Sequence, residues 1–220
     1  MPFATWGGSR AGAGRKRGQR PPTPHRARPV HRAAHPVHVT LRSSFRPLRS
    51  QHVFPALVLA ISRSNRRDGA RFRVLHFSVQ YDHIHLIVEA ADQDALSTGV
   101  RSLAIGMALA INRLVMRRGR LWADRWFGRA LTSPRQVRHA LVYVLANFRK
   151  HARREHPPGV DRFSSGSWFD GWRGALPRDS AGGVARPVSS PRTWLAGIGW
   201  RRLGLIGFSE MPATDGLLLS

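Results

Sequence analysis

Residues 72–89 read FRVLHFSVQYDHIHLIVE, and this stretch decides the fold of the chain. Both halves alternate and are rich in β-branched and aromatic residues, so they predict two neighbouring antiparallel strands around the turn at residues 80–82. A strict period of two assigns the side chains of the first strand to two faces: Phe72, Val74, His76 and Ser78 on one, and Arg73, Leu75, Phe77 and Val79 on the other.

The segments outward from this pair complete an α+β pattern. Residues 37–41 alternate as a strand, residues 50–65 have helical periodicity, and a second helix is expected over 94–117, capped by Asp92 or Asp94. A loop over 121–132 leads into a fourth strand, and Ser133 and Pro134 then begin a third helix that extends to about residue 153. The order β-α-β-β-α-β is typical of a ferredoxin-like sandwich, an antiparallel sheet with helices on one face, here followed by an additional helix at its C-terminal end.

Composition divides the chain into three parts. Residues 1–34 are rich in Arg, Gly and Pro and contain no acid, so we expect a basic, disordered arm that either anchors phosphates or is a solvated tail. Residues 35–156 form one domain, and residues 157–220 form a Gly-, Pro- and Trp-rich extension. Residues 164–172 and 191–205 of the extension look like short apolar segments that wrap the domain.

Charge and cysteine content narrow the chemistry. Lys and Arg number 36 against 12 Asp and Glu, for a formal net charge of +24, which favours a nucleic-acid partner. The absence of Cys excludes disulfides, zinc ribbons and cysteine nucleophiles. We expect no membrane span, because the best apolar run, residues 55–61, is short, and no secretory signal; a cytoplasmic, nucleoid-associated protein is the default.

Two short patterns could carry catalysis. His83 and His85 project from one face of their strand with Ile84 on the other, which offers two imidazoles to one divalent cation, although two such His also arise by chance. Tyr143 and Asn147 are one helical turn apart on one face, so the Asn147 amide oxygen could complete a cation site beside a tyrosine nucleophile. The alternative is that Tyr143 is a core residue whose hydroxyl bonds locally.

The His-hydrophobic-His strand, the element order and the Tyr-x-x-x-Asn spacing together resemble the single-tyrosine HUH transposases, most closely the REP-associated tyrosine transposase branch. The resemblance covers residues 35–151 and implies Mg²⁺ or Mn²⁺ on His83, His85 and Asn147, with Tyr143 attacking single-stranded DNA. Some relatives are dimers, so a homodimer is possible. Two positions depart from the pattern: Asp82 stands where Asn is common, as a turn former or as an orienter of an imidazole, and Phe148 stands where Pro is frequent and predicts that the helix continues to His151.

A basic and aromatic stretch near the expected fourth strand could bind single-stranded DNA by phosphate contacts and base stacking. Its alternative is an aromatic set that faces the core, covered by Arg stems. Its members are Arg117, Arg118, Arg120, Trp122, Arg125, Trp126 and Arg129. His139 and His151 share the helical face of Tyr143, and Glu89 shares the strand face of His85; solvated or ion-paired surface positions are the simpler interpretation of all three.

These observations lead to the expectation of a metal-dependent DNA strand transferase. It would cleave and rejoin single-stranded or hairpin DNA through a 5′-phosphotyrosine. Two alternatives stay open: a protein of the same fold that binds structured DNA or RNA without catalysis, and a metal phosphoesterase that uses water as the nucleophile.

Overall fold

The computed structural model describes residues 30–148, 159–176 and 185–212, which form a mixed α+β structure. The strands are β1 (Val37–Arg42), β2 (Phe72–Val79), β3 (His83–Ala90), β4 (Phe127–Ala130), β5 (Trp172–Arg173) and β6 (Ile206–Gly207). The helices are α1 (Phe54–Asp68), α2 (Gln93–Leu114), α3 (Pro134–Ala146) and α4 (Trp194–Gly197), with the 3₁₀ turns η2 (Ser165–Trp168) and η3 (Gly199–Leu203). The predicted α+β class is therefore confirmed.

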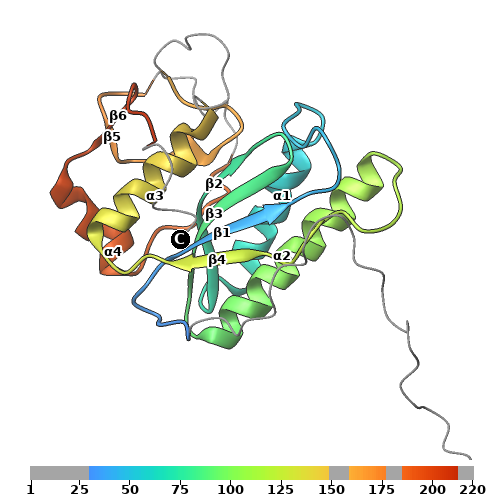
Figure 1. Ribbon diagram of the computed structural model, residues 1–220, viewed down its shortest axis with the longest axis horizontal. Coiled ribbons are helices and arrows are strands. Elements are labelled where there is room, and N and C mark those ends of the chain that lie inside the picture. Colours follow the sequence, from blue (N-terminus) through green and yellow to red (C-terminus); the bar gives the residue numbers. More distant parts are fainter. Residues whose placement is uncertain (1–29, 149–158, 177–184, 213–220) are drawn as a thin grey trace, which may run out of the picture.

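The first four strands form one antiparallel sheet in the order β2-β3-β1-β4. The register places Thr40 opposite His85 and His38 opposite Arg129, so three strands bring polar residues to the same region of one face. Figure 1 shows α1 and α2 on one side of this sheet and α3 with α4 on the other. Both faces are therefore covered, the second by α3 and by the segments that follow it.

The larger core lies between the sheet and the pair α1 and α2. It contains Val39 and Leu86 from the sheet and Leu57, Val100 and Met107 from the two helices, all buried. Asp92 caps α2, since its carboxylate accepts a hydrogen bond of 2.7 Å from the backbone N–H of Ala95, as the sequence predicts. α2 has the length and, with a mean hydropathy of 1.3, the composition of a membrane span, which the sequence analysis does not anticipate. One side of α2 packs on α1 and the sheet.

β2 departs from the strict alternation that the sequence predicts. Val74 pairs with Val88 and His76 with Ile87, so the register shifts at Leu75. A bulge of this kind reverses the faces of every later residue in the strand. Phe77 and Val79 accordingly join Phe72 and Val74 in the α1–α2 core, and His76 and Ser78 turn to the α3 side; the predicted pairing of His76 with Phe72 and Val74 is wrong for this reason.

The smaller core joins α3 to the sheet and to the C-terminal segments. Leu75 and Ile87 of the sheet and Leu141 of α3 pack there against Phe169 and Trp200. The two apolar segments expected around residues 164–172 and 191–205 therefore lie against α3. The aromatic rings in this layer stack or meet edge to face, as Phe169 does with Trp200 at 5.5 Å between centroids.

Ion pairs fasten these segments to the domain. Arg49 makes two hydrogen bonds, of 2.8 and 2.7 Å, to the buried carboxylate of Asp161, and it donates a third to the carbonyl of Val79. Arg138 of α3 binds the carboxylate of Glu210. Bidentate Arg–carboxylate pairs have a well-defined geometry. They therefore hold Asp161 beside Arg49 and Glu210 beside α3.

α3 begins as predicted. Ser133 is its N-cap and accepts from the N–H of Gln136 at 3.3 Å, and Pro134 is in its first turn. The α-helix ends at Ala146, so Asn147 is the C-cap. The expected continuation to His151 and residue 153, the boundary near residue 156 and all but residues 30–34 of the basic arm lie outside the described residues.

Candidate functional site

The two histidines of β3 lie side by side on the α3 face of the sheet. Ile84 between them is buried in the α1–α2 core, and the His83 and His85 rings are 4.6 Å apart between centroids. His85 is buried and His83 is half-buried at the end of the strand. The alternation of β3 thus produces the pair as the sequence predicts.

His38 of β1 is a further member of the cluster that the sequence reading missed. Its Nε2 is 3.2 Å from Nδ1 of His85, and Oγ1 of Thr40 is also 3.2 Å from that Nδ1. Because Nδ1 of His85 is engaged by β1, Nε2 is the atom through which His85 could bind a cation. The alternation of Val37 and Val39 with His38 and Thr40 already indicates that His38 and Thr40 share one strand face. The sequence does not indicate that this strand lies beside β3.

His38 is uncharged near neutral pH. Burial, and then the positive charge of Arg129 on the neighbouring strand, lower its pKa to about 4. A neutral imidazole has one nitrogen that accepts a hydrogen bond and one that donates, whereas both nitrogens of an imidazolium donate. His38 can therefore accept a hydrogen bond from Nδ1–H of His85.

Asp82 both occupies the turn before β3 and contacts the first histidine. Its Oδ1 is 2.8 Å from Nδ1 of His83, and its other oxygen is 3.0 Å from the guanidinium of Arg46. The hydrogen bond from His83, followed by the charges of His83, Arg46 and Arg42, lowers the pKa of Asp82 despite its partial burial. Both alternatives for Asp82 therefore hold, because the residue shapes the turn and orients the imidazole.

Tyr143 of α3 lies over the histidines. Its ring centroid is 4.9 Å from that of His85 and 5.7 Å from that of His38, both edge to face. The side chain is half-buried, while its helix neighbours Val142 and Val144 are buried. α3 therefore brings the predicted nucleophile to the predicted histidines, although they are about 60 residues apart in the chain.

Asn147 follows Tyr143 by one helical turn and is the C-cap of α3. The residue is 1% exposed, and neither Oδ1 nor Nδ2 has a hydrogen-bond partner in the part of the chain that the structure describes. An unpaired buried amide is costly and uncommon in folded proteins. Among the described residues no group of three or more His, Cys, Asp or Glu side chains could hold a metal ion.

Arg129 is the one residue of the predicted DNA-binding stretch whose backbone lies opposite His38. It stands on β4 in direct register with that histidine, and its charge acts on it. Its Nη1 is buried and makes no hydrogen bond within the described ranges. A guanidinium placed in this way can receive an anion next to the tyrosine.

The other residues of that stretch form the loop between α2 and β4. This loop adjoins the His83 end of the sheet, because Ala123 N–H donates to the carbonyl of Arg42 at 2.9 Å, and Arg42 is opposite His83. Arg118, Arg120 and Arg125 are exposed there. Arg117 is half-buried and donates to the carbonyl of Arg120 at 2.8 Å, which braces the loop.

The two tryptophans of the loop are partly buried against the α1–α2 core. Nε1 of Trp122 donates a 2.8 Å hydrogen bond to the carbonyl of Ala104 on α2. Trp126 lies over Gly128, where a Cβ atom would be 2.5 Å from its ring. Their geometry favours packing as their main role, and base stacking by Trp122 and Trp126 stays a prediction.

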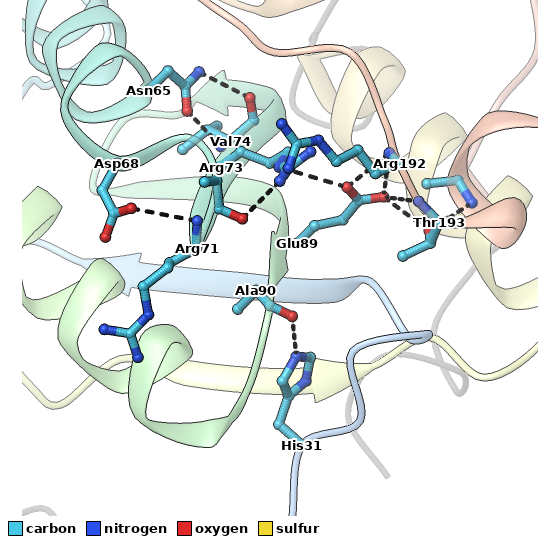
Figure 2. A network of polar contacts seen from close by, with 12 residues as sticks. His31, Asn65, Asp68, Arg71, Arg73, Val74, Glu89, Ala90, Arg192 and Thr193 are labelled. Carbon is cyan, nitrogen blue, oxygen red and sulfur yellow. Dashed lines mark hydrogen bonds and ion pairs between the residues drawn. The ribbon is translucent and has the colours of Figure 1, made fainter.

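The remaining candidates have structural roles or lie elsewhere. Glu89 does face the α3 side, as expected, but it is buried and ion-paired to Arg73 at 3.9 Å and hydrogen-bonded to Arg192 and Thr193 (Figure 2). His139 is half-buried on α3. His151 lies outside the described residues.

Comparison with solved structures gives a structural likeness. A solved structure of a REP-associated tyrosine transposase bound to a REP hairpin aligns with a TM-score of 0.47 and 21% identity, over 58% of this chain and 74% of that one. No protein-family model matches the chain. No curated protein matches it either.

Proposed function

We propose that this chain is a metal-dependent DNA strand transferase of the single-tyrosine HUH type, built on a ferredoxin-like sheet, that cleaves and rejoins single-stranded or hairpin DNA. The single observation that carries the proposal is the cluster in which Tyr143 lies against His85 and His38, 4.9 and 5.7 Å between ring centroids, in a structure whose Asn147 amide is buried and unsatisfied among the described residues. A tyrosine against strand histidines, followed one helical turn later by an amide, supplies the kinds of group that phosphodiester transfer would require.

The reaction of Tyr143 is a substitution at phosphorus. Its phenol oxygen attacks the phosphodiester and loses its proton, the bond from phosphorus to the 3′ oxygen breaks, and that oxygen leaves as a protonated 3′-OH. The products are a 5′-phosphotyrosine on Tyr143 and a free DNA 3′ end. Attack by a DNA 3′-OH on the phosphotyrosine reverses the step and rejoins DNA, since the bond energy is conserved in the protein–DNA ester.

His83, His85 and Asn147 are the residues that would hold Mg²⁺ or Mn²⁺. When bound, the ion would neutralise charge on the phosphate oxygens. The chain contacts the two imidazoles from behind: Oδ1 of Asp82 is 2.8 Å from Nδ1 of His83, and Nε2 of His38 is 3.2 Å from Nδ1 of His85. Contacts at Nδ1 would orient each ring so that Nε2 is the atom that holds the ion.

Basic residues on either side of the cluster would hold the DNA. Arg129 is positioned for a phosphate next to Tyr143, and the exposed Arg118, Arg120 and Arg125 line the loop beside the His83 end of the sheet. We assign a weaker role to Arg117, Trp122 and Trp126, whose side chains also brace the loop. A cytoplasmic, nucleoid-associated location agrees with such a partner, and some DNA strand transferases of this type act as homodimers.

The test is the capture of the covalent intermediate. Synthetic hairpin oligonucleotides with single-stranded flanks, labelled at the 3′ or the 5′ end, are incubated with the full chain and Mn²⁺ and resolved under denaturing conditions. We expect the 3′ label to migrate with the protein and the 5′ label to leave on a shorter fragment. EDTA should abolish both products.

The matched control uses the two tyrosines of the chain. Tyr143→Phe should remove the adduct, and Tyr81→Phe should keep it, because Tyr81 is 59% exposed in the turn before β3. Cleavage that survives in Tyr143→Phe would identify a phosphoesterase that uses water. Salt-sensitive binding without any adduct over a range of hairpins would identify a binding protein, and either result overturns the proposal.

A further inference from the structure

A groove of about 540 Å³ opens at the far end of β3 from His83, and nothing in the proposed reaction uses it. Arg73 of β2, Glu89 of β3 and the segment Arg192–Leu195 line it, together with residues 33–35. Figure 2 shows the charged part of this lining, with the Arg192 side chain running toward Arg73. The groove is on the α3 face of β3, four residues along the strand from His85.

The only carboxylate in the lining is already satisfied. Glu89 accepts hydrogen bonds from the backbone N–H of Arg192 at 2.9 Å, from the N–H of Thr193 at 2.9 Å and from the Thr193 hydroxyl at 2.8 Å. These bonds use the oxygens of Glu89 to anchor the C-terminal segment to β3. Oε2 of Glu89 also forms the ion pair with Arg73, 3.9 Å from its Nε.

Arg73 has one hydrogen-bond acceptor among the described residues, the carbonyl of Ala70, to which its Nη2 donates at 2.9 Å. Arg73 is 5% exposed, and its Nε makes no hydrogen bond within the described residues; its nearest carboxylate oxygen is 3.9 Å away. Arg73 and Arg192 line the same groove. Burial lowers the pKa of Arg73, and so does the charge of Arg192, against the opposing charge of Glu89. Paired guanidinium groups with an open groove between them and solvent favour an anion.

An aromatic platform stands beside this cationic pair. Trp194 is 48% exposed, and the guanidinium carbon of Arg202 lies 5.3 Å from the centroid of its ring. Exposed Trp next to Arg is the combination on which unpaired bases stack, with the phosphates on the cations. A chain with a net charge of +24 gives such a surface a polyanionic partner.

We propose that this groove binds one nucleotide of single-stranded DNA, with its phosphate between Arg73 and Arg192 and its base on Trp194. The inference rests on the proposed function for the identity of the strand. α3 and the buried Ile87 separate the groove from Tyr143, so the nucleotide bound here is a flanking one and contributes affinity, not bond cleavage.

The binding test uses the Tyr143→Phe chain, in which no covalent step interferes, and fluorescent hairpin oligonucleotides with single-stranded flanks. Trp194→Ala should weaken binding about tenfold, the lower range for loss of one stacked base. Arg192→Gln should reduce the slope of log affinity against log salt by about 0.7, the value for one single-strand phosphate contact. Arg66→Gln is the matched control, an exposed arginine on α1 across the sheet, and should change neither quantity.

A scan with abasic sites makes the base contact specific. Removing the base at one flanking position should weaken the Trp194 form about tenfold and leave the Trp194→Ala form unchanged, because the same contact is lost in both. Unfolding midpoints of the variants exclude damage to the fold. In the active chain, Trp194→Ala should raise the DNA concentration at half-maximal adduct formation without lowering the maximal rate.

Several results would overturn this inference independently of the proposed function. They are Trp194→Ala and Arg192→Gln affinities that match Arg66→Gln, abasic effects that add to Trp194→Ala at every position, and full competition by thymidine monophosphate alone, which would make the groove a site for free nucleotides. Failure of the proposed function has a different signature, since it removes the covalent adduct and leaves these binding differences in place.

Discussion

Replacing Asn147 by Leu should stabilise the fold and abolish function. The buried amide destabilises the folded state, because it makes no hydrogen bond to the described residues. Asn147 is 1% exposed, and both polar atoms of its side chain lack partners in the described part of the chain. An unpaired buried polar group costs about 1–3 kcal/mol by mutational data. Leu has a similar shape and no polar atoms, although its extra bulk costs part of the gain.

We expect Asn147→Leu to raise the free energy of unfolding by about 1–2 kcal/mol in EDTA. For a chain of this size that corresponds to an increase in Tm of about 2–8 °C. Mn²⁺ should then raise the Tm of the natural chain, since a ligand that binds only the folded state stabilises it, and should leave Asn147→Leu unchanged. Thermal unfolding by circular dichroism, with and without Mn²⁺, measures both effects.

Asn65 provides the matched control because its amide is fully used. Its Nδ2 donates to the carbonyls of Val74 and Pro187 at 3.1 and 2.9 Å, and its Oδ1 accepts from the N–H of Val74 at 2.8 Å. Asn65→Leu should therefore lower the free energy of unfolding by about 2–3 kcal/mol. The reasoning is refuted if Asn147→Leu destabilises the chain as Asn65→Leu does, or if Mn²⁺ stabilises Asn147→Leu as much as the natural chain.

Three further substitutions test other parts of the structure. Glu89→Gln should lower the free energy of unfolding by about 3 kcal/mol in urea titrations, because it removes a buried charge that pairs with Arg73 and holds the C-terminal segment; an unchanged midpoint would contradict this. Arg129→Gln should slow adduct formation about 100-fold in single-turnover experiments, against less than tenfold for the exposed Arg125→Gln. Burial lowers the pKa of His76 to about 3, together with the charges of Arg186 and Arg201 and against the opposing charge of Asp170. The unfolded chain therefore binds this proton more tightly than the folded chain does. The free energy of unfolding should consequently fall as the pH drops from about 6.5 to about 3. His76→Leu should lose that part of the acid sensitivity, and a pH profile parallel to that of the natural chain would disprove the assignment.

Local periodicity was enough to predict the elements and part of the site. Alternation in residues 83–89 placed His83 and His85 on one face, and helical spacing placed Asn147 one turn after Tyr143. Residue type identified Ser133 as one helix cap and Asp92 or Asp94 as another; the structure has Ser133 and Asp92 in these roles. These features depend on neighbours within a few residues, which the sequence contains directly.

The faces of β2 show where periodicity failed. A bulge adds one residue to a strand and inverts the alternation after it, and nothing in the run from Phe72 to Val79 marks Leu75 as that residue. The consequence is large, since His76 and Ser78 move from the predicted side of the sheet to the side of α3. Only pairing with β3 reveals the shift.

The α+β class, the shared strand face of His83 and His85, the one-turn spacing of Tyr143 and Asn147, and the strong positive charge all follow from the sequence alone. Only the tertiary structure decided that His38 and Arg129 join this cluster, that Glu89 anchors the C-terminal segment, and that Arg73 meets Arg192 beside Trp194. The physical reason is the range of the interactions. The period of a helix or strand depends on neighbours within a few residues. Strand order and the packing of distant segments join residues up to about 120 positions apart, and no local pattern specifies such a partner.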